Sequence, residues 1–334
     1  MKVKLFFGNH EAIKKSGIGR ALIHQKQALE LAGIEYTVDN NCYDYDILHI
    51  NVVLPSALKE LKYARKHNKA ILYHAHSTCE DFKNSFMFSN ILAPSFKKWL
   101  VYLYSQGDML ITPTPYAKKI LLSYNINKPI KDLSNGINIS DFTPTNSQIE
   151  LFNKTYGILE NDQVVIGVGW LFERKGFDTF IEVATLLPNI KFIWFGDIHA
   201  SNPTLKIKKL IRNLPTNVIL PGYVDGTVIK GAYGRANIFF FPSREETEGI
   251  VVLEALSAKI SILLRDIPVF EPWLNDGVNC YKRNDVLGFK KAIEDILIKK
   301  LSDTTESGFE IVKNRQLEYI GQELKKVYQF ILRG

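Results

Sequence analysis

The chain has 334 residues, of which 46% are hydrophobic, and this length predicts two domains of about 150 residues, each with a full core. Its three cysteines, Cys42, Cys79 and Cys280, are too few and too scattered for a disulfide framework or a zinc site, which favours a reducing compartment. No segment approaches the roughly 20 apolar residues of a membrane span, and the start of the chain lacks the apolar run of a signal peptide.

The positive charge is concentrated in the first half. Residues 1–157 hold 19 of the 42 Lys and Arg but 13 of the 35 Asp and Glu, so they carry +6 of the net charge of +7. A basic half indicates an anionic partner, either nucleic acid or an anionic membrane. No nucleic-acid-binding motif accompanies the charge, so we favour the membrane; a basic domain without such a partner remains the alternative.

In the first half, short apolar strands alternate with helices. The expected strands are residues 3–7, 46–51, 70–74, 108–112 and 130–134, and the expected helices are residues 20–32, 56–67, 95–105 and 116–124. Such alternation predicts a parallel sheet with helices on both faces.

The second half repeats this plan. Its expected strands are residues 163–168, 191–195, 218–220 and 238–241, and its expected helices are residues 177–187, 204–213, 228–235 and 251–258. A polar linker is expected near residues 143–161. The fold class is therefore α/β with two doubly wound, Rossmann-like domains, over residues 1–150 and 158–313, followed by a long helix within residues 314–334.

The most informative stretch runs from Glu246 to Glu254, where two carboxylates lie eight positions apart with Gly249 between them. A buried strand precedes the stretch and a helix begins within it. A helix N-terminus suits a phosphate, and a carboxylate two turns into the helix can accept hydrogen bonds from sugar hydroxyls. These features predict a site for a sugar nucleotide.

This stretch resembles the Glu-x7-Glu signature of the retaining GT-B glycosyltransferases of family 4. The resemblance implies two domains that face a cleft and a C-terminal helix that crosses back to the first domain. It also implies that Glu254 holds the ribose of the donor and Glu246 the transferred sugar, while backbone groups of Gly249, Ile250 and Val251 approach the phosphates.

A second strand-to-helix loop, Gly167 to Gly176, opens the second domain with two cations, Arg174 and Lys175. Cations in such a loop can clamp a pyrophosphate. Lys175-Gly176 matches the family pattern, but Trp170 occupies the place of the usual arginine. Arg174 therefore supplies the second cation, or the site uses one; a solvated charge pair is the alternative.

Two glycines, Gly17 and Gly19, follow the first strand and open the first helix, where backbone N–H groups can approach a ligand. Dinucleotide binding would require a third glycine at the position of Leu22. The resemblance implies contact with the donor phosphate or the acceptor. Likewise Gly222 and Tyr223, after a later strand, resemble the loop that contacts the base.

His74 and His76 end the expected strand 70–74. If the strand continued, their side chains would point to opposite faces. The family commonly places a histidine here against the transferred sugar, and we assign this role to His76, the later of the two. No third ligand accompanies the pair, so a metal is not expected. Asp44 and Asp46, which have the spacing of metal-binding acids, lead directly into a strand and are interpreted as its cap.

Aromatic residues and lysines are interleaved over residues 82–104, including Phe86, Phe88, Lys97 and Lys98. Such a mixture suits a membrane interface. The alternative is that Trp99 and its neighbours at helical spacing face the core.

A narrower pattern, with His76 and Gly17 among its residues, resembles the Gram-positive glycolipid glycosyltransferases. It implies a retaining transfer of a hexose, galactose in the first instance, from a UDP-hexose donor to a glycolipid acceptor such as monoglucosyl-diacylglycerol. The catalytic residues would be His76, Lys175 and Glu246, without a cofactor or metal.

The enzyme would act from the cytoplasm, peripherally on the inner face of the cell membrane. Three alternatives remain. They are a UDP-glucose-dependent transferase acting on diacylglycerol, a cell-wall polysaccharide or a protein; a non-catalytic GT-B partner subunit; and an oxidoreductase.

Overall fold

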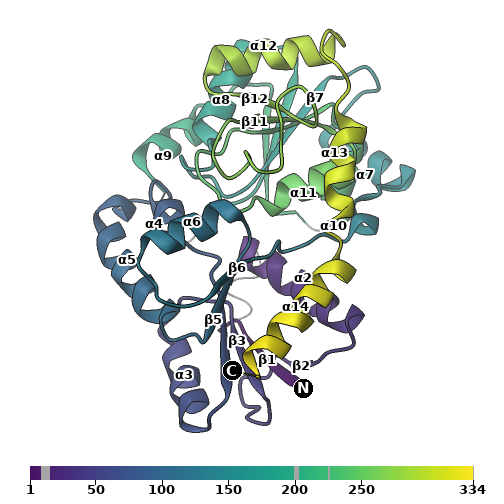
Figure 1. Cartoon of the computed structure of the whole chain (residues 1–334). Helices are drawn as coiled ribbons and strands as arrows, with labels where there is room; N and C mark the ends of the chain where they lie inside the picture. The colour runs from purple at the N-terminus through teal and green to yellow at the C-terminus, as the bar shows by residue number, and fades with distance from the viewer. Residues whose placement is uncertain (9–15, 199–202, 225, 334) are drawn as a thin grey trace. The chain divides into compact units, whose positions relative to one another are not determined.

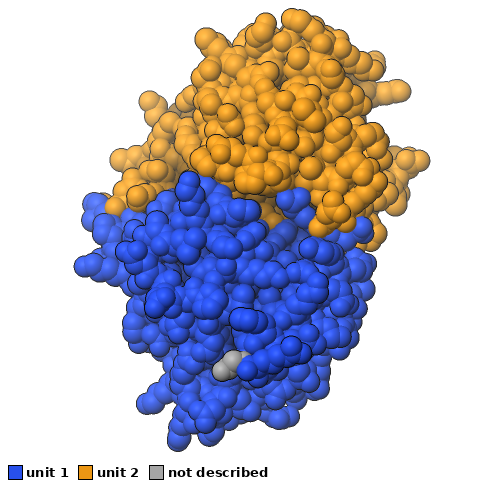
Figure 2. All heavy atoms as spheres, viewed as in Figure 1, with its two compact units in different colours: residues 1–82, 91–137, 315–334 blue, residues 83–90, 138–314 orange. Residues whose placement is uncertain are grey.

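The computed structural model describes residues 1–8, 16–198, 203–224 and 226–333 (Figure 1). The chain forms two compact units (Figure 2). Unit 1 comprises residues 1–82, 91–137 and 315–334, and unit 2 comprises residues 83–90 and 138–314. The second unit thus includes residues 138–150 and one short segment, 83–90, from the range expected for the first domain, 1–150.

Unit 1 contains a six-stranded parallel sheet with strand order β2-β1-β3-β4-β5-β6. The strands are β1 (Lys2–Phe6), β2 (Glu35–Thr37), β3 (Ile47–Ile50), β4 (Ala70–His74), β5 (Met109–Thr112) and β6 (Ile130–Asp132). The helices are α2 (Gly17–Leu31), α3 (Ala57–Lys66), α4 (Cys79–Phe82), α5 (Ser89–Tyr104), α6 (Pro115–Ser123) and α14 (Leu317–Ile331).

Helix α14 returns to unit 1 and packs against α2, as expected of the C-terminal helix (Figure 1). Its buried face, which includes Leu324 and Tyr328, joins the same core cluster as Ala28 and Leu29 of α2. The helices cross closely at Gly321, where a Cβ atom would lie 2.1 Å from the carbonyl oxygen of Ala28. A larger residue at this position would separate the two helices.

Unit 2 contains a second six-stranded parallel sheet, with order β12-β11-β10-β7-β8-β9. Its strands are β7 (Val164–Val168), β8 (Lys191–Phe195), β9 (Val218–Gly222), β10 (Ile238–Phe241), β11 (Ser261–Arg265) and β12 (Tyr281–Arg283). Its helices are η1 (Ile139–Phe142), α7 (Asn146–Tyr156), α8 (Phe177–Leu186), α9 (Leu205–Arg212), α10 (Gly226–Arg235), α11 (Ile250–Ser257), α12 (Val286–Leu297) and α13 (Thr305–Lys313).

The prediction of a polar linker over residues 143–161 was wrong, because this stretch contains helix α7. Thr145 caps α7 and forms a reciprocal capping box with Gln148, while Gly157 ends the helix in the left-handed conformation, with φ 59°. Helix α5 also begins earlier than expected, and Pro94 lies inside it.

The aromatic and basic segment is partly a core element. Leu100 and Leu103 are fully buried, and the indole of Trp99 donates to the carbonyl of Val53 at 2.7 Å. Among the residues that the structure describes, no helix is both long and apolar enough to cross a membrane.

Candidate active site

The order of strands in unit 2 brings two loops together. From the middle of the sheet, β7, β8 and β9 follow one another toward one edge, and β10, β11 and β12 follow one another toward the opposite edge. Ligands of open α/β sheets bind outside the carboxyl ends of the strands at such a reversal point. The loops that follow β7 and β10 carry Lys175 and Glu246, so sheet topology places both residues at this edge.

Lys175 and Glu246 form a close ion pair, with 2.5 Å between Lys175 Nζ and Glu246 Oε1. The hydroxyl of Ser243 donates to the same carboxylate oxygen at 2.7 Å. The Lys175 ammonium also lies 5.5 Å from the centre of the Phe241 ring. Glu246 is buried, with 5% of its surface exposed, so its charge depends on these partners.

Two opposing effects act on the pKa of Glu246. Burial raises it, while the charges of Lys175 and Arg174 and hydrogen bonds from Lys175 and Ser243 lower it. The partners prevail, and the pKa lies below its ordinary value. Glu246 is therefore an anion and a hydrogen-bond acceptor at neutral pH.

Arg174 lies beside this pair and is itself buried. Its Nη1 atom donates to the carbonyl of Glu245 at 2.9 Å and lies 4.0 Å from the carboxylate of Glu246. Its Nε atom donates to the hydroxyl of Ser85 at 3.0 Å, and its backbone N–H donates to the carbonyl of Asn84 at 3.0 Å. The segment 83–90 thus holds both the backbone and the side chain of Arg174.

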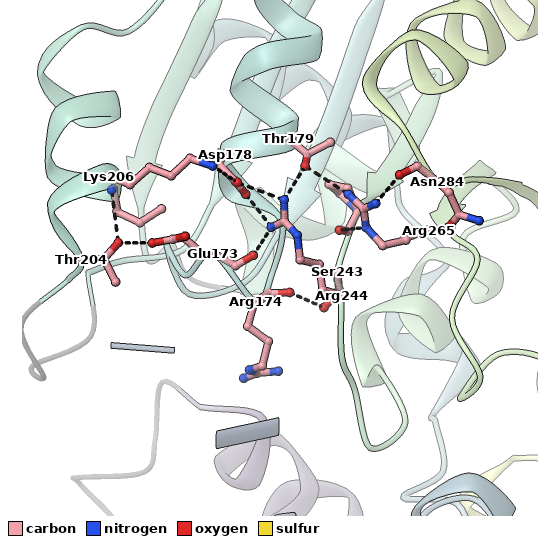
Figure 3. Close-up of polar contacts among 12 residues, drawn as sticks. Glu173, Arg174, Asp178, Thr179, Thr204, Lys206, Ser243, Arg244, Arg265 and Asn284 are labelled. Carbon is pink, nitrogen blue, oxygen red and sulfur yellow. Dashed lines mark hydrogen bonds and ion pairs between the residues drawn. The ribbon is translucent and has the colours of Figure 1, made fainter. Parts of the chain in front are cut away.

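A polar network fixes the β7–α8 loop against the β10–α11 loop (Figure 3). Arg244 donates to both carboxylate oxygens of Asp178, at 2.7 and 3.0 Å, and Lys206 donates to one of them at 2.5 Å. Arg244 and Arg265 both donate to the hydroxyl of Thr179, at 3.0 and 3.1 Å. Burial raises the pKa of Asp178, but the bonds from Arg244 and Lys206 outweigh it and lower the pKa.

Gly176 allows the two loops to approach each other. Its φ of 76° lies in the left-handed region, and a Cβ atom there would lie 2.2 Å from the carbonyl oxygen of Pro242. Any other residue would therefore push the β10–α11 loop away from Lys175.

Helix α11 begins at Gly249, which caps it with φ 85°, and continues through Ile250 and Val251. Glu254, in its second turn, is buried, and the hydroxyl of Tyr233 donates to it at 2.9 Å. The predicted strand, turn and helix start are therefore present, with Glu246 in the turn and Glu254 in the helix.

Two other expected positions in unit 2 lie on different loops. Gly222 ends β9 with φ 77°, its carbonyl accepts from the backbone N–H of Gly196 at 2.9 Å, and Tyr223 after it is exposed. Trp170, at the place of the family arginine, stacks with Phe172, with 6.4 Å between ring centres.

In unit 1, the expectation that the two histidines would point to opposite faces was conditional on a longer strand. Strand β4 ends at His74, and the backbone N–H of His76 donates a hydrogen bond to the carbonyl of His74 at 3.1 Å. Because of this tight turn, the two rings stack with centres 3.8 Å apart. His76 Nε2 lies 2.9 Å from Asn51 Oδ1.

Gly17 and Gly19 lie in the first turn of α2, where the side chain of Ser16 accepts from the backbone N–H of Gly19 at 3.2 Å. Most of the preceding insertion, residues 9–15, lies outside the described residues. Asp46 accepts the backbone N–H of Lys2 at 2.8 Å, and Asp44 pairs with the Lys2 ammonium at 3.2 Å. Within the described ranges, no group of three or more His, Cys, Asp or Glu is arranged to hold a metal ion.

Sequence reasoning missed three contributors to this site. Ser243 follows Pro242 directly after the expected strand 238–241, and it was assigned no role. Asp178, an acid in the first turn of α8, could have been identified as a partner for nearby cations. Ser85 gave no local signal, because its contact with Arg174 spans 89 residues of sequence.

Two parallel sheets of Rossmann type, one of them with a cationic loop and a buried glutamate at its reversal point, define the class of GT-B nucleotide-sugar transferases. The family described as Glycosyltransferase Family 4 matches residues 17–141, and the family described as Glycosyl transferases group 1 matches residues 148–308. The chain belongs to the group 1, family 4 glycosyltransferases, and it is an enzyme of the hexosyltransferase type.

Among its relatives is the processive diacylglycerol alpha-glucosyltransferase of Acholeplasma laidlawii, which is 45% identical over 100% of this chain and 99% of the relative. The alpha-galactosylglucosyldiacylglycerol synthase of Streptococcus pneumoniae is 26% identical over 70% of this chain and 63% of its own length.

The fold is shared with HepE of Anabaena, solved in complex with UDP-glucose, at a TM-score of 0.81 and 16% identity over 98% of this chain and 99% of that one. It is also shared with sucrose-phosphate synthase of Thermosynechococcus elongatus, at a TM-score of 0.84 and 16% identity over 99% of both chains.

Proposed function

We propose that this glycosyltransferase moves glucose from UDP-glucose to diacylglycerol, and then to its own glucolipid product, with retention of the anomeric configuration. The observation that carries the proposal is the 45% identity, along the whole chain, to a processive diacylglycerol glucosyltransferase. Our sequence-based preference for galactose becomes the second candidate, and it is favoured by the 26% identity to a galactosylglucosyldiacylglycerol synthase.

The donor site of the proposal lies in unit 2, with the pyrophosphate at Lys175 and Arg174. When the bond between the anomeric carbon and the phosphate oxygen breaks, negative charge develops on UDP. Lys175, Arg174 and the first N–H groups of α11, from Gly249 to Val251, stabilise this charge. Glu254 holds the ribose, and Tyr223, after Gly222, lies beside the base.

Glu246 and His76 bind the transferred sugar, and an acceptor hydroxyl attacks from the face that UDP leaves. The new carbon–oxygen bond forms there, and the hydroxyl proton passes to the departing phosphate. In the free protein Lys175 neutralises Glu246, so we propose that the donor pyrophosphate competes with Glu246 for the ammonium when it binds.

Because cations of the chain supply the positive charge, we propose that no divalent metal takes part. Activity that is abolished by EDTA and restored by Mg²⁺ or Mn²⁺ would contradict this and would make Asp44 and Asp46 the candidate metal ligands.

The lipid acceptor requires the enzyme to reach a membrane, and the stretch from Phe88 to Lys98 is proposed to provide the contact. Phe88 and Ile91 are 64% and 75% exposed, and Lys98, two turns after Ile91 on helix α5, is exposed as well. Lys97 is a weaker candidate, because its ammonium lies 4.3 Å from the centre of the Tyr124 ring. Apolar side chains can enter the interface while lysine contacts anionic headgroups.

The first experiment offers UDP-glucose or UDP-galactose to vesicles that contain diacylglycerol or monoglucosyl-diacylglycerol, and identifies the products by mass spectrometry. Glucose incorporation on both acceptors, giving one and then further hexoses, supports the proposal. Incorporation of galactose alone, and on monoglucosyl-diacylglycerol alone, selects the second candidate.

A second experiment measures sedimentation with anionic vesicles. The Phe88→Ser, Ile91→Ser and Lys98→Glu substitutions together should weaken binding while UDP affinity is retained. Leu205→Ser, at a residue of unit 2 that is 74% exposed, is the matched control and should leave binding unchanged. Wild-type protein that ignores anionic vesicles would contradict the membrane contact.

A further inference from the structure

A buried amide pair lies behind His76. Gln25 of α2 and Asn51, after β3, are both buried, and their side chains exchange two hydrogen bonds. Gln25 Nε2 donates to Asn51 Oδ1 at 3.0 Å, and Asn51 Nδ2 donates to Gln25 Oε1 at 3.1 Å. Such a reciprocal pair fixes the orientation of each amide relative to the other, although both amides could be reversed together without losing the two bonds.

A backbone carbonyl sets the direction of the pair. Asn51 Nδ2 also donates to the carbonyl oxygen of His49 at 3.4 Å. A carbonyl oxygen only accepts, so the nitrogen of the Asn51 amide must face it, and the oxygen must face the other way. If the Asn51 amide were reversed, its oxygen would face the carbonyl oxygen of His49. At Gln25, oxygen would then face oxygen and NH2 would face NH2.

The direction of the pair decides the tautomer of His76. Asn51 Oδ1 can only accept, and His76 Nε2 lies 2.9 Å from it. The proton of the neutral ring must therefore sit on Nε2, which leaves Nδ1 with a lone pair. Burial lowers the pKa of His76 to about 3, so the ring is neutral at physiological pH.

We infer that the Gln25–Asn51 pair is a positioning element that holds His76 with its proton on Nε2, so that Nδ1 accepts a hydrogen bond from a hydroxyl group of the transferred sugar. The inference rests on the proposed function, in which His76 contacts that sugar at the carboxyl end of β4. A neutral ring with Nδ1 as acceptor selects hydroxyl-bearing sugars, because a carboxylate there would place lone pair against lone pair.

The neighbouring His74 is a contrast. Its Nδ1 atom lies 2.7 Å from Gln25 Nε2, which donates to it. Its proton is therefore on Nε2, a buried atom without a hydrogen-bond partner among the described residues. In His74, Nδ1 is therefore hydrogen-bonded and Nε2 is buried, so neither atom can bind a ligand. In His76, Nδ1 remains available to accept a hydrogen bond from a ligand.

The tautomer is tested by NMR on protein labelled with ¹⁵N-histidine. Long-range ¹⁵N–¹H correlations should show a protonated Nε2 and an unprotonated Nδ1 for His76, assigned by loss of the signal in His76→Phe. In Asn51→Leu the two tautomers should mix. The matched control is Thr112→Val, which removes a buried bond of 3.1 Å to the carbonyl of Ala75 next to His76 and should leave the tautomer unchanged.

The functional consequence is tested by a double-mutant cycle on kcat/KM for UDP-glucose. Asn51→Leu and His76→Phe should each lower kcat/KM about ten-fold. The double variant should be no worse than His76→Phe, because the amide pair acts through this ring. UDP affinity and a cooperative thermal transition confirm that each variant is folded.

Three results would overturn the inference, and they have different causes. A proton on Nδ1 in the wild type contradicts the tautomer. Fully additive losses show that Asn51 supports the fold rather than His76. Unchanged kcat/KM in His76→Phe shows that His76 does not contact the sugar. This result leaves the proposed glucosyl transfer intact, because that is judged separately from the products.

Discussion

The two units use related sheets to present different chemistry. Counted within each unit, the strand order is 2-1-3-4-5-6 in unit 1, an extended flavodoxin-like order, and 3-2-1-4-5-6 in unit 2, the order of dinucleotide-binding domains. The reversal point of unit 2 carries charges, Lys175, Arg174 and Glu246. Among the described residues at the carboxyl edge of the unit 1 sheet, Asn51 and His76 are neutral polar groups.

This difference matches what each unit is proposed to bind. A departing pyrophosphate needs cations, and the cations need a counter-ion when the donor is absent, as Glu246 is for Lys175. Sugar hydroxyls need neutral donors and acceptors with fixed directions. Under this proposal the same edge of a parallel sheet serves both tasks, and the side chains on the loops decide which one.

The comparison implies that buried charge in unit 1 supports the fold rather than a ligand. Lys4 of β1 is fully buried and its ammonium lies 2.8 Å from Glu60, while it also donates to the carbonyls of Asn40 and Cys42. Lys4→Met should leave Glu60 unpaired and lower the free energy of unfolding by about 3–5 kcal/mol, measured by urea unfolding. The double variant with Glu60→Leu should recover much of the loss; a single variant as stable as wild type would contradict this role.

In unit 2 the corresponding removal of charge should affect catalysis. Lys175→Ala should lower kcat by about 10²-fold, because it removes a cation from the departing phosphate. Steady-state kinetics measures the loss. Lys191→Ala is the matched control, since it breaks an ion pair of 2.7 Å with Asp162 in the same unit, at the other end of the sheet. An equal loss of kcat in both variants would show that Lys175 supports the stability of unit 2 and does not act on the phosphate.

A fall in pH should destabilise unit 1 before unit 2. Burial, followed by repulsion from the protonated form of His76, lowers the pKa of His49 to about 3, and burial lowers that of His76 to about 3. Because the unfolded state binds protons near pH 6.5, each histidine stabilises the fold fully above that pH and loses up to about 2 kcal/mol by pH 5.

Glu246 and Asp178 have lowered pKa values, so their contributions are present above about pH 4.5 and are lost only as the pH falls through the folded values. Hydrogen exchange at pH 7 and pH 5 should therefore show loss of protection in β3 and β4 of unit 1 before α8 and α11 of unit 2. The reverse order would contradict the comparison.

The smallest expected effect concerns the segment that unit 2 takes from the first half of the chain. Ser85→Ala removes the acceptor of Arg174 Nε and should weaken UDP binding about three- to ten-fold while uridine binding is unchanged, measured by calorimetry. Ser85→Thr, which keeps a hydroxyl, is the control. Equal losses for UDP and uridine would show that Ser85 does not act through the phosphates.

The sequence predicted those features that depend on local patterns. Strand–helix alternation predicted both sheets, and the stretch from Glu246 to Glu254 with its flanking residues predicted β10, the turn after it and the start of α11. Helix α7 was missed although its signal was local, because the polar composition around Thr145 and Gln148 obscured a capping box. The contacts of Ser85 and of Asn51 could not be predicted, since they join residues that only the completed fold brings together.

The crossing at Gly321 has a consequence for how the protein is made. Residues 138–314 of unit 2 leave the ribosome before α14, so most of that unit can form its sheet while synthesis continues. Unit 1 begins first but must wait for residues 317–331 to cover α2 and β1. Until α14 is made, the apolar face of α2 that it covers is open to solvent or to a chaperone, so unit 1 completes its core only after all strands of unit 2 have been synthesised.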